Sequence, residues 1–222
     1  MVVRAAKADH PQIYKDIIEG LLSAYQFPLY FFDYETFASA IPLIDGARPH
    51  QHYPVQYSLH IVDKDGRITH KEFLQREAKL PRNLVDQMEN DFGAEGSIVS
   101  WHASFEKTQN KEMAKWFPEK AEFLTTINQR MVDLEDIFKE AYVDIKFKGS
   151  TSIKKVLPVI CPHLGYQGLQ IMDGANAMDA WHQMIQAEGS KAEEIAGALL
   201  AYCKMDTLAM VEIHRFLEKL NT

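Results

Sequence analysis

Apolar and polar residues follow one another along the chain with two different periods, and these periods predict strands and helices. Alternating or short unbroken apolar runs predict strands over residues 29–36, 55–62, 67–74, 97–101 and 131–133. Apolar positions three and four residues apart predict helices over residues 10–25, 81–92, 105–116, 119–130, 152–160, 175–187 and 191–220, and a short helix ending at residue 138. The segment 142–176 has no clear period, and we expect it to carry a substrate loop.

The order of these elements predicts an α/β fold. The Asp65-Gly66 step between the second and third strands is typical of a hairpin, so these two strands should pair antiparallel. The later strands alternate with helices, which favours a mixed sheet flanked by helices. We expect residues 1–26 to form an N-terminal lead-in helix and residues 27–222 to form one domain.

Composition agrees with a soluble protein, since 46% of the residues are apolar and 25% are charged. No apolar run approaches the roughly 20 residues that span a bilayer, and residues 1–10 lack the apolar core of a signal peptide. Cys161 and Cys203 form no Cys-x-x-Cys pair, which fits a reducing compartment. We therefore expect a cytoplasmic protein without a membrane partner.

The net charge of −7 argues against a protein that coats duplex DNA, because such proteins are usually basic. It does not exclude a small nuclease site, since cations held by clustered carboxylates provide positive charge where a phosphate binds. The nine histidines are scattered and form no His-x-x-x-His pair, so no zinc site is expected.

The first predicted strand carries two acids where burial is expected. Asp33 and Glu35 project to the same face, because side chains alternate along a strand. Two like charges repel there, and desolvation adds to the cost. Either the strand has emerged into solvent at this point, or a divalent cation is held by both carboxylates.

The last predicted helix carries another acid on its apolar stripe. The stripe contains Ile195, Leu199, Tyr202, Asp206, Ala209, Ile213, Phe216 and Leu220. A buried aspartate without a partner is costly, so Asp206 either pairs with a buried arginine or lysine or shares a metal with the first two acids. Tyr202 lies one turn earlier on the same face.

A fourth acid follows the strand over residues 97–101. Glu106 lies in the first turn of the next predicted helix, and Ser104 is the expected N-cap. A favourable contact with the helix dipole explains Glu106 taken alone. Beside the other three acids it becomes a candidate metal ligand.

These residues resemble the three motifs of DnaQ-like 3′–5′ exonucleases: Asp33-x-Glu35-Thr36, then Phe105-Glu106, then Tyr202-x-x-x-Asp206. The third motif is similar to the tyrosine (DEDDy) subgroup, and Ala201 excludes the histidine form. The chain also resembles an uncharacterised bacterial domain family that often forms the C-terminal end of longer proteins. The resemblance implies a ribonuclease-H-like five-stranded sheet, with three antiparallel strands followed by two parallel ones.

The resemblance also implies roles for the acids in hydrolysis of a phosphodiester at a 3′ end with two ions, Mg²⁺ or Mn²⁺. Asp33 would contact both ions, Glu35 and Asp206 would complete the first, and Glu106 would support the second. Tyr202 would orient the attacking water. The second motif departs from the usual His-Asn-x-x-Phe-Asp pattern, because Glu106 replaces its final aspartate.

The expected partner is the 3′ end of a nucleic acid, either single-stranded or a short oligonucleotide. The residues that we expect to contact it are Thr36, Phe37, His102, Ser152 and Lys154. Packing explains Thr36 and Phe37 equally well, and a solvated helix start explains Ser152 and Lys154.

Two other classes of function remain open from the sequence. One is an inactive or weak nuclease-fold module that binds nucleic acid or a protein without cutting. The other is an endonuclease or transposase-like protein of the same broad fold. The four acids favour an enzyme, and the Tyr-x-x-x-Asp arrangement favours the exonuclease.

Overall fold

The computed structural model describes residues 10–221, so residues 1–9 of the predicted lead-in segment 1–26 lie outside the described residues. A five-stranded sheet has the order β4-β3-β2-β5-β6. The strands are β2 (Leu29–Phe37), β3 (Tyr53–Val62), β4 (Ile68–Leu74), β5 (Ile98–Ser100) and β6 (Met131–Asp133). β2, β3 and β4 pair antiparallel, whereas β5 pairs parallel with both β2 and β6. The predicted hairpin and the mixed α/β sheet are confirmed.

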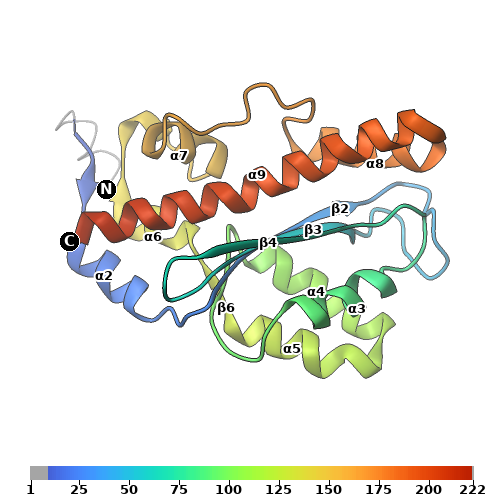
Figure 1. Cartoon of the computed structure of the whole chain (residues 1–222), viewed down its shortest axis with the longest axis horizontal. Coiled ribbons are helices and arrows are strands. Elements are labelled where there is room, and N and C mark those ends of the chain that lie inside the picture. Colours follow the sequence, from blue (N-terminus) through green and yellow to red (C-terminus); the bar gives the residue numbers. More distant parts are fainter. Residues whose placement is uncertain (1–9, 222) are drawn as a thin grey trace.

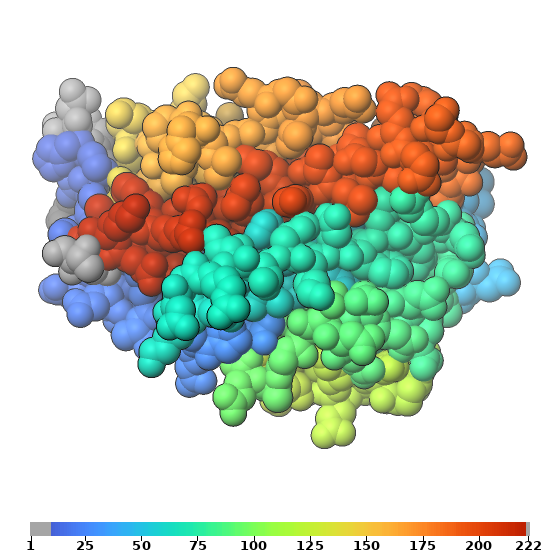
Figure 2. Space-filling view, viewed as in Figure 1, coloured from blue at the N-terminus to red at the C-terminus, as the bar shows by residue number. Residues whose placement is uncertain are grey.

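Helices cover both faces of this sheet (Figure 1). One face packs on α3 (Arg82–Asp91), α4 (Ser104–Trp116) and α5 (Ala121–Arg130), with a short 3-10 turn, η1 (Pro118–Lys120), before α5. Along the other face runs α9 (Gly189–Asn221), and around it lie α2 (Lys15–Ser23), α6 (Glu135–Glu140), α7 (Ile153–Ile160) and α8 (Gly174–Gln186). Figure 2 shows α9 as a red and orange band between the teal β4 region and the yellow-orange residues of α7 and the segment that follows it.

The first predicted helix is wrong at its start. Instead of being helical, β1 (Gln12–Ile13) pairs antiparallel with β7 (Tyr142–Val143), and the helix begins at Lys15. The backbone of Tyr14 extends this contact by donating to Ala141 O at 2.9 Å. Pairing between segments so distant in sequence overrides the local helical period.

The segment without a clear period contains more structure than its sequence predicts. It includes β7, a short 3-10 turn, η2 (Ile145–Phe147), and α7, and it then runs as coil to α8. Part of this coil, around Tyr166, packs against α9. None of the described helices combines the length and the apolar content that crossing a membrane requires.

Along β2 the side chains alternate between the two faces of the sheet. Tyr30 and Phe32 pack with α3, α4 and α5, whereas Phe31 packs with α9. Burying an aromatic or leucine side chain of this kind stabilises the fold by roughly 1.5–3 kcal/mol. On the α9 face, however, Asp33 and Glu35 interrupt the apolar series between Phe31 and Phe37. The interruption lies opposite Asp206 of α9 and forms the candidate site.

Candidate metal centre

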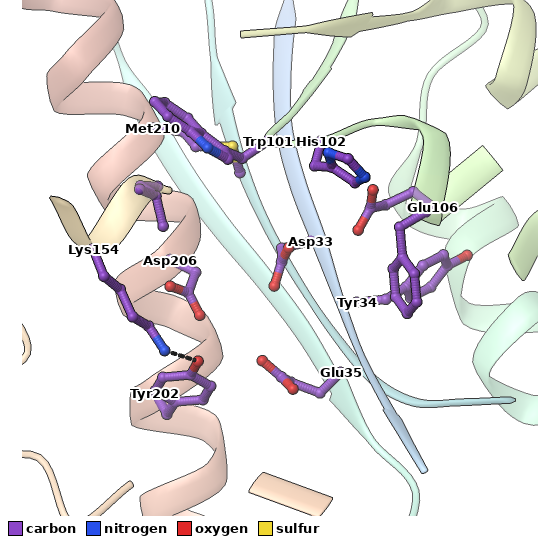
Figure 3. A pocket seen from close by; sticks show the side chains of 12 residues that line it. Asp33, Tyr34, Glu35, Trp101, His102, Glu106, Lys154, Tyr202, Asp206 and Met210 are labelled. Atoms are coloured by element: carbon purple, nitrogen blue, oxygen red, sulfur yellow. Dashed lines mark hydrogen bonds between the residues drawn. The ribbon is translucent and has the colours of Figure 1, made fainter. Parts of the chain in front are cut away.

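A cavity of about 280 Å³ lies between the sheet and α9. Its walls come from β2, the turn between β5 and α4, the start of α7, and the middle of α9 (Figure 3). The five residues that the resemblance implies to be catalytic all line it: Asp33, Glu35, Glu106, Tyr202 and Asp206. We call the four carboxylates of this set the acid cluster, and Figure 3 shows them directed toward a common space.

Local structure explains how each acid reaches the cavity. Asp33 and Glu35 are two residues apart on β2, so both project toward α9. Asp206 lies on the buried stripe of α9 and is only 8% exposed. Glu106 is on the first turn of α4 and is only 2% exposed. Of the two alternatives for this strand, emergence into solvent is not what the structure shows, because Glu35 is only 9% exposed and Asp33 is half-buried.

Burial and mutual repulsion hold these carboxyl groups toward their neutral forms. Burial raises the pKa of Asp33 well above its usual range, and the charges of Asp206, Glu106 and Glu35 raise it further. The pKa of Glu35 rises to about 8 for the same reasons, burial first and Asp206 second. The pKa of Glu106 rises to about 8, and that of Asp206 to about 6, with burial as the largest cause in both. Without a cation the charged cluster is therefore an unfavourable arrangement.

Glu106 has a buried carboxylate oxygen, Oε2, that accepts no hydrogen bond from the described residues. Leaving a buried polar atom unpaired costs roughly 1–3 kcal/mol, and more when the group is charged. Figure 3 shows this carboxylate on the side of the cavity opposite Asp206. An unpaired oxygen in this position is the arrangement expected of a ligand whose partner is a cation.

The start of α4 places Glu106, and it differs from our prediction. Ser104 is not the N-cap, because Ala103 occupies that position and Ser104 is exposed within the first turn. Asp133, at the end of β6, accepts hydrogen bonds from the backbone N–H groups of His102 at 3.0 Å and Ala103 at 3.1 Å. These bonds support His102 in a left-handed conformation with φ 63°, which costs a residue other than glycine roughly 1–3 kcal/mol.

Lys154 connects α7 to the tyrosines of the cavity. Its ammonium donates to Tyr202 OH at 2.8 Å and to Met172 O at 2.7 Å, and it lies 4.9 Å from the ring centroid of Tyr202 (Figure 3). Tyr166, from the coil after α7, donates its hydroxyl to a carboxylate oxygen of Asp206. Among the described residues that line the cavity, Lys154 is the single lysine, so four carboxylates face one ammonium group in the cavity.

The structure separates the residues that we expected to contact substrate. Lys154 and His102 line the cavity. Thr36, Phe37 and Ser152 are not among its lining residues. Phe37 packs in the core 4.9 Å from Trp181, Thr36 lies 2.8 Å from His52 Nδ1, and Ser152 is exposed before α7. Packing therefore accounts for Phe37.

The donor set of the cavity fits divalent cations. Carboxylate oxygens are the ligands that Mg²⁺ and Mn²⁺ prefer. Ligand atoms of Asp33, Glu35 and Cys203 lie within 4.8 Å of one another. Asp206 and Glu106 face the same cavity from α9 and α4. The excess of negative charge and the unpaired oxygen of Glu106 both favour a bound cation.

Three residues at or beside the site, Tyr166, Asp133 and Cys203, are not among the defining residues of the motifs in the sequence. Tyr166 lies in coil, where no period indicates its direction. Asp133 ends a parallel strand beside β5, and an acid at the carboxyl end of a parallel strand is a signal that the sequence does contain. Cys203 follows Tyr202 and lies three residues before Asp206, so its helical face was readable.

Comparisons with known proteins place this chain in a family whose function is not described. A family model described as a domain of unknown function (DUF2779) matches residues 30–152, more than half of the 222 residues. The uncharacterized protein MG366 of Mycoplasma genitalium is 31% identical over 214 residues, which cover 86% of this chain and 32% of that protein. Its homolog in Mycoplasma pneumoniae is 28% identical over 210 residues, covering 85% of this chain and 32% of that protein.

A third relative, the uncharacterized protein UU173 of Ureaplasma parvum, is 28% identical over 216 residues, covering 86% of this chain and 31% of that protein. The chain thus spans about a third of the length of these relatives. No solved structure matches it. The expected resemblance to an uncharacterised bacterial domain family is confirmed, and the chain belongs to the family described as a domain of unknown function, DUF2779.

Proposed function

We propose that this chain is a divalent-metal-dependent 3′–5′ exonuclease that hydrolyses phosphodiester bonds of DNA or RNA. One observation carries the proposal: four carboxylates and Tyr202, from three separate elements, line one cavity, and three of these carboxylates are buried. A buried cluster of like charges is unfavourable unless a cation neutralises it. The order and directions of the five strands also support a ribonuclease-H-like sheet of the DnaQ type.

The acid cluster would hold Mg²⁺ or Mn²⁺. Asp33, Glu35 and Asp206 would bind one ion, and Asp33 with Glu106 would bind a second. Bound divalent cations activate water and stabilise the leaving oxygen in phosphodiester hydrolysis. Because the carboxylates of Asp33, Glu35 and Asp206 are fixed on β2 and α9, they would hold these ions more precisely than carboxylates on loops.

Tyr202 and Lys154 act on the reacting groups from the α7 side. The oxygen of Tyr202 accepts a hydrogen bond from Lys154, and its O–H donates to Asp206, so the hydroxyl is held at the edge of the acid cluster, where it would reach a water or a phosphate oxygen. Tyr202 stays protonated, since burial first and then the charge of Asp206 raise its pKa. Lys154 also places positive charge beside the acid cluster, where a phosphodiester must approach.

Two aromatic side chains offer a surface for the terminal bases. Trp101 and Phe105 line the cavity and are half-buried. The indole of Trp101 is held in place because its N–H donates to Thr151 O at 3.0 Å and its ring packs 5.4 Å from Phe138. Stacking of a base on an aromatic ring contributes roughly 1–3 kcal/mol without selecting a sequence.

A 5′-labelled single-stranded oligonucleotide, supplied as DNA and as RNA, tests the proposal. We expect a ladder that shortens from the 3′ end with Mn²⁺ or Mg²⁺ and stops with EDTA. Asp33→Ala and Asp206→Ala should abolish the ladder. Glu122→Gln, an exposed acid of α5 on the opposite face of the sheet, is the matched control and should keep it.

Two further substrates separate the competing functions. A 3′-blocked oligonucleotide should resist hydrolysis, and a circular single strand should stay intact; cleavage of the circle would indicate an endonuclease. Equal activity of wild type and both alanine variants would attribute the ladder to a contaminant. Absence of hydrolysis together with absence of Mn²⁺ binding in calorimetry would replace the proposal with a module that binds without cutting.

A further inference from the structure

Cys203 is a fully buried thiol that contacts Asp33 of the acid cluster. Its Sγ lies 3.8 Å from the backbone oxygen of Asp33 and 3.9 Å from Asp33 Oδ2, and it is fully buried. Among the described residues, Sγ and carboxylate oxygens of Asp33 and Glu35 form a group of potential metal ligands within 4.8 Å of one another. The sulfur of Cys203 is therefore a third potential metal ligand in this group, and it comes from α9.

The second cysteine shows what an ordinary buried thiol looks like in this fold. Cys161 is also buried and free, but it belongs to the hydrophobic cluster that contains Leu157 and Ile160. Buried cysteines usually behave as small apolar side chains of this kind. Cys203 belongs to none of the three hydrophobic clusters of the described residues. Its surroundings differ from those of Cys161 because carboxylate oxygens of Asp33 and Glu35 lie within 4.8 Å of its sulfur.

The distances permit one ion to contact the sulfur and a carboxylate together. Ligand atoms on a zinc-sized ion lie at most about 4.5 Å apart, because its bonds to sulfur and oxygen are about 2.3 Å and 2.0–2.2 Å. The separation of 3.9 Å between Cys203 Sγ and Asp33 Oδ2 is already within this limit. Thiolate is a soft ligand that favours ions such as Zn²⁺ and Co²⁺, whereas Mg²⁺ favours oxygen.

We propose that Cys203 is a thiolate ligand for thiophilic divalent cations, such as Zn²⁺, Co²⁺ or Cd²⁺, at the Asp33–Glu35 end of the acid cluster. The inference rests on the proposed metal site and adds its ion selectivity. The thiol releases its proton to solvent as the sulfur binds the ion, so no oxidant or reductant takes part. The site then binds softer ions through sulfur and oxygen, and Mg²⁺ through oxygen alone.

Cobalt spectroscopy tests this coordination directly. Co²⁺ is titrated into metal-free protein, while calorimetry measures its dissociation constant and that of Mg²⁺. A thiolate-to-Co²⁺ charge-transfer band in the near ultraviolet is expected for wild type and for Cys161→Ser, and none for Cys203→Ser. The preference for Co²⁺ over Mg²⁺ should fall in Cys203→Ser by at least about tenfold, since even an outer-shell partner contributes roughly 10–100-fold to metal affinity.

The outcomes distinguish this inference from the proposed function. Stoichiometric Co²⁺ binding by wild type without the band, or a band that persists in Cys203→Ser, would overturn the thiolate ligand and leave the carboxylate site intact. No binding of Co²⁺, Mn²⁺ or Mg²⁺ by wild type would overturn both. Circular dichroism of Cys203→Ser and Cys203→Ala verifies the fold. Cys203→Ala should also lack the band, and it provides no ligand atom, so it controls for binding by the serine oxygen.

Discussion

Two groups of polar side chains lie next to each other between α9 and the sheet, and they differ in whether their buried polar atoms are paired. The acid cluster extends from β2, where Asp33 is directly opposite Ser58 of β3. Ser58 belongs to the second group, which we call the hydroxyl–histidine network and which consists of Ser58, His60, His70 and Thr207. Thr207 follows Asp206 on α9, so both groups share the same helix and the same sheet.

The hydroxyl–histidine network is internally satisfied. Ser58 Oγ lies 2.9 Å from His70 Nε2 and 2.7 Å from Thr207 Oγ1, and His60 Nδ1 lies 2.8 Å from the same Thr207 oxygen. Burial lowers the pKa of both histidines to about 4, and each is further opposed by neighbouring positive charge, so they are neutral at physiological pH. A neutral, hydrogen-bonded network stabilises a core.

The acid cluster has the opposite character. Its members repel one another, and Glu106 Oε2 has no partner among the described residues. The difference shows how a buried polar group is recognised as structural or as functional. Complementary donors and acceptors indicate a structural role, whereas like charges with an unpaired oxygen indicate a functional one. Four predictions test this distinction, from the largest expected effect to the smallest.

Asp33→Asn should lower exonuclease activity by on the order of 10³-fold, comparable with loss of other groups that act directly on a transition state. The same variant should be more stable than wild type in EDTA, because it removes a carboxylate that repels Glu35, Glu106 and Asp206. Ser58→Ala, on the adjacent strand, should reverse the pattern by keeping activity and losing stability. Initial rates and urea unfolding measure the two effects. Equal loss of activity in a folded Ser58→Ala would break the distinction.

Mn²⁺ should stabilise the protein through the acid cluster alone. At a free concentration 100 times the dissociation constant, a ligand that binds the folded state adds about 2.7 kcal/mol to the free energy of unfolding. We expect this gain in wild type and in Thr207→Val, and no gain in Asp33→Asn or Asp206→Asn. Thermal melts with and without Mn²⁺ measure it. A full gain in Asp33→Asn would place the ion elsewhere.

Thr207→Val should lower the free energy of unfolding by about 1–3 kcal/mol, the cost of leaving buried polar partners unsatisfied. Valine keeps the shape of the side chain but leaves Ser58 and His60 without their shared partner. Thr126→Val on α5 is the control, since Thr126 is exposed and should change stability by less than about 0.5 kcal/mol. Urea unfolding in EDTA compares the two. Equal effects would mean that the network contributes nothing specific.

Without metal, the acid cluster and the hydroxyl–histidine network should make the free energy of unfolding depend on pH in opposite directions. The pKa of Glu35 rises from 4.5 to about 8 on folding, so its folded state binds more protons in this range and stability falls as pH rises. The pKa of His60 falls from 6.5 to about 4, so the unfolded state binds more protons there and stability rises with pH.

Between about pH 7.5 and 8 the carboxyl groups therefore dominate this balance, since the histidines are largely neutral in both states. In EDTA we expect the free energy of unfolding to decrease across this range, and Mn²⁺ should remove the decrease. Glu106→Gln should flatten the slope partly, because its pKa is also raised to about 8. A stability that increases with pH in EDTA would contradict the assignment.

Much of the fold was predictable because it depends on periods within single elements. The strands over β2, β3 and β4 and the stripe of α9 are local patterns, and they were read to within two residues. The same patterns placed Asp33 and Asp206 toward the core, since each interrupts an apolar series of its own element. Gln12 and Ile13 were misread because their strand exists only through pairing with Tyr142 and Val143.

The sequence by itself determined which acids face inward, because direction along a strand or helix follows from the backbone period. Only the tertiary structure decided what each of them meets. Asp133 accepts hydrogen bonds from the turn before α4, and Tyr166 reaches Asp206 from a coil without any period. Two cysteines that look alike in the sequence differ because Cys203 meets Asp33 across 170 positions of chain. Such contacts depend on how the elements pack, and no local pattern encodes them.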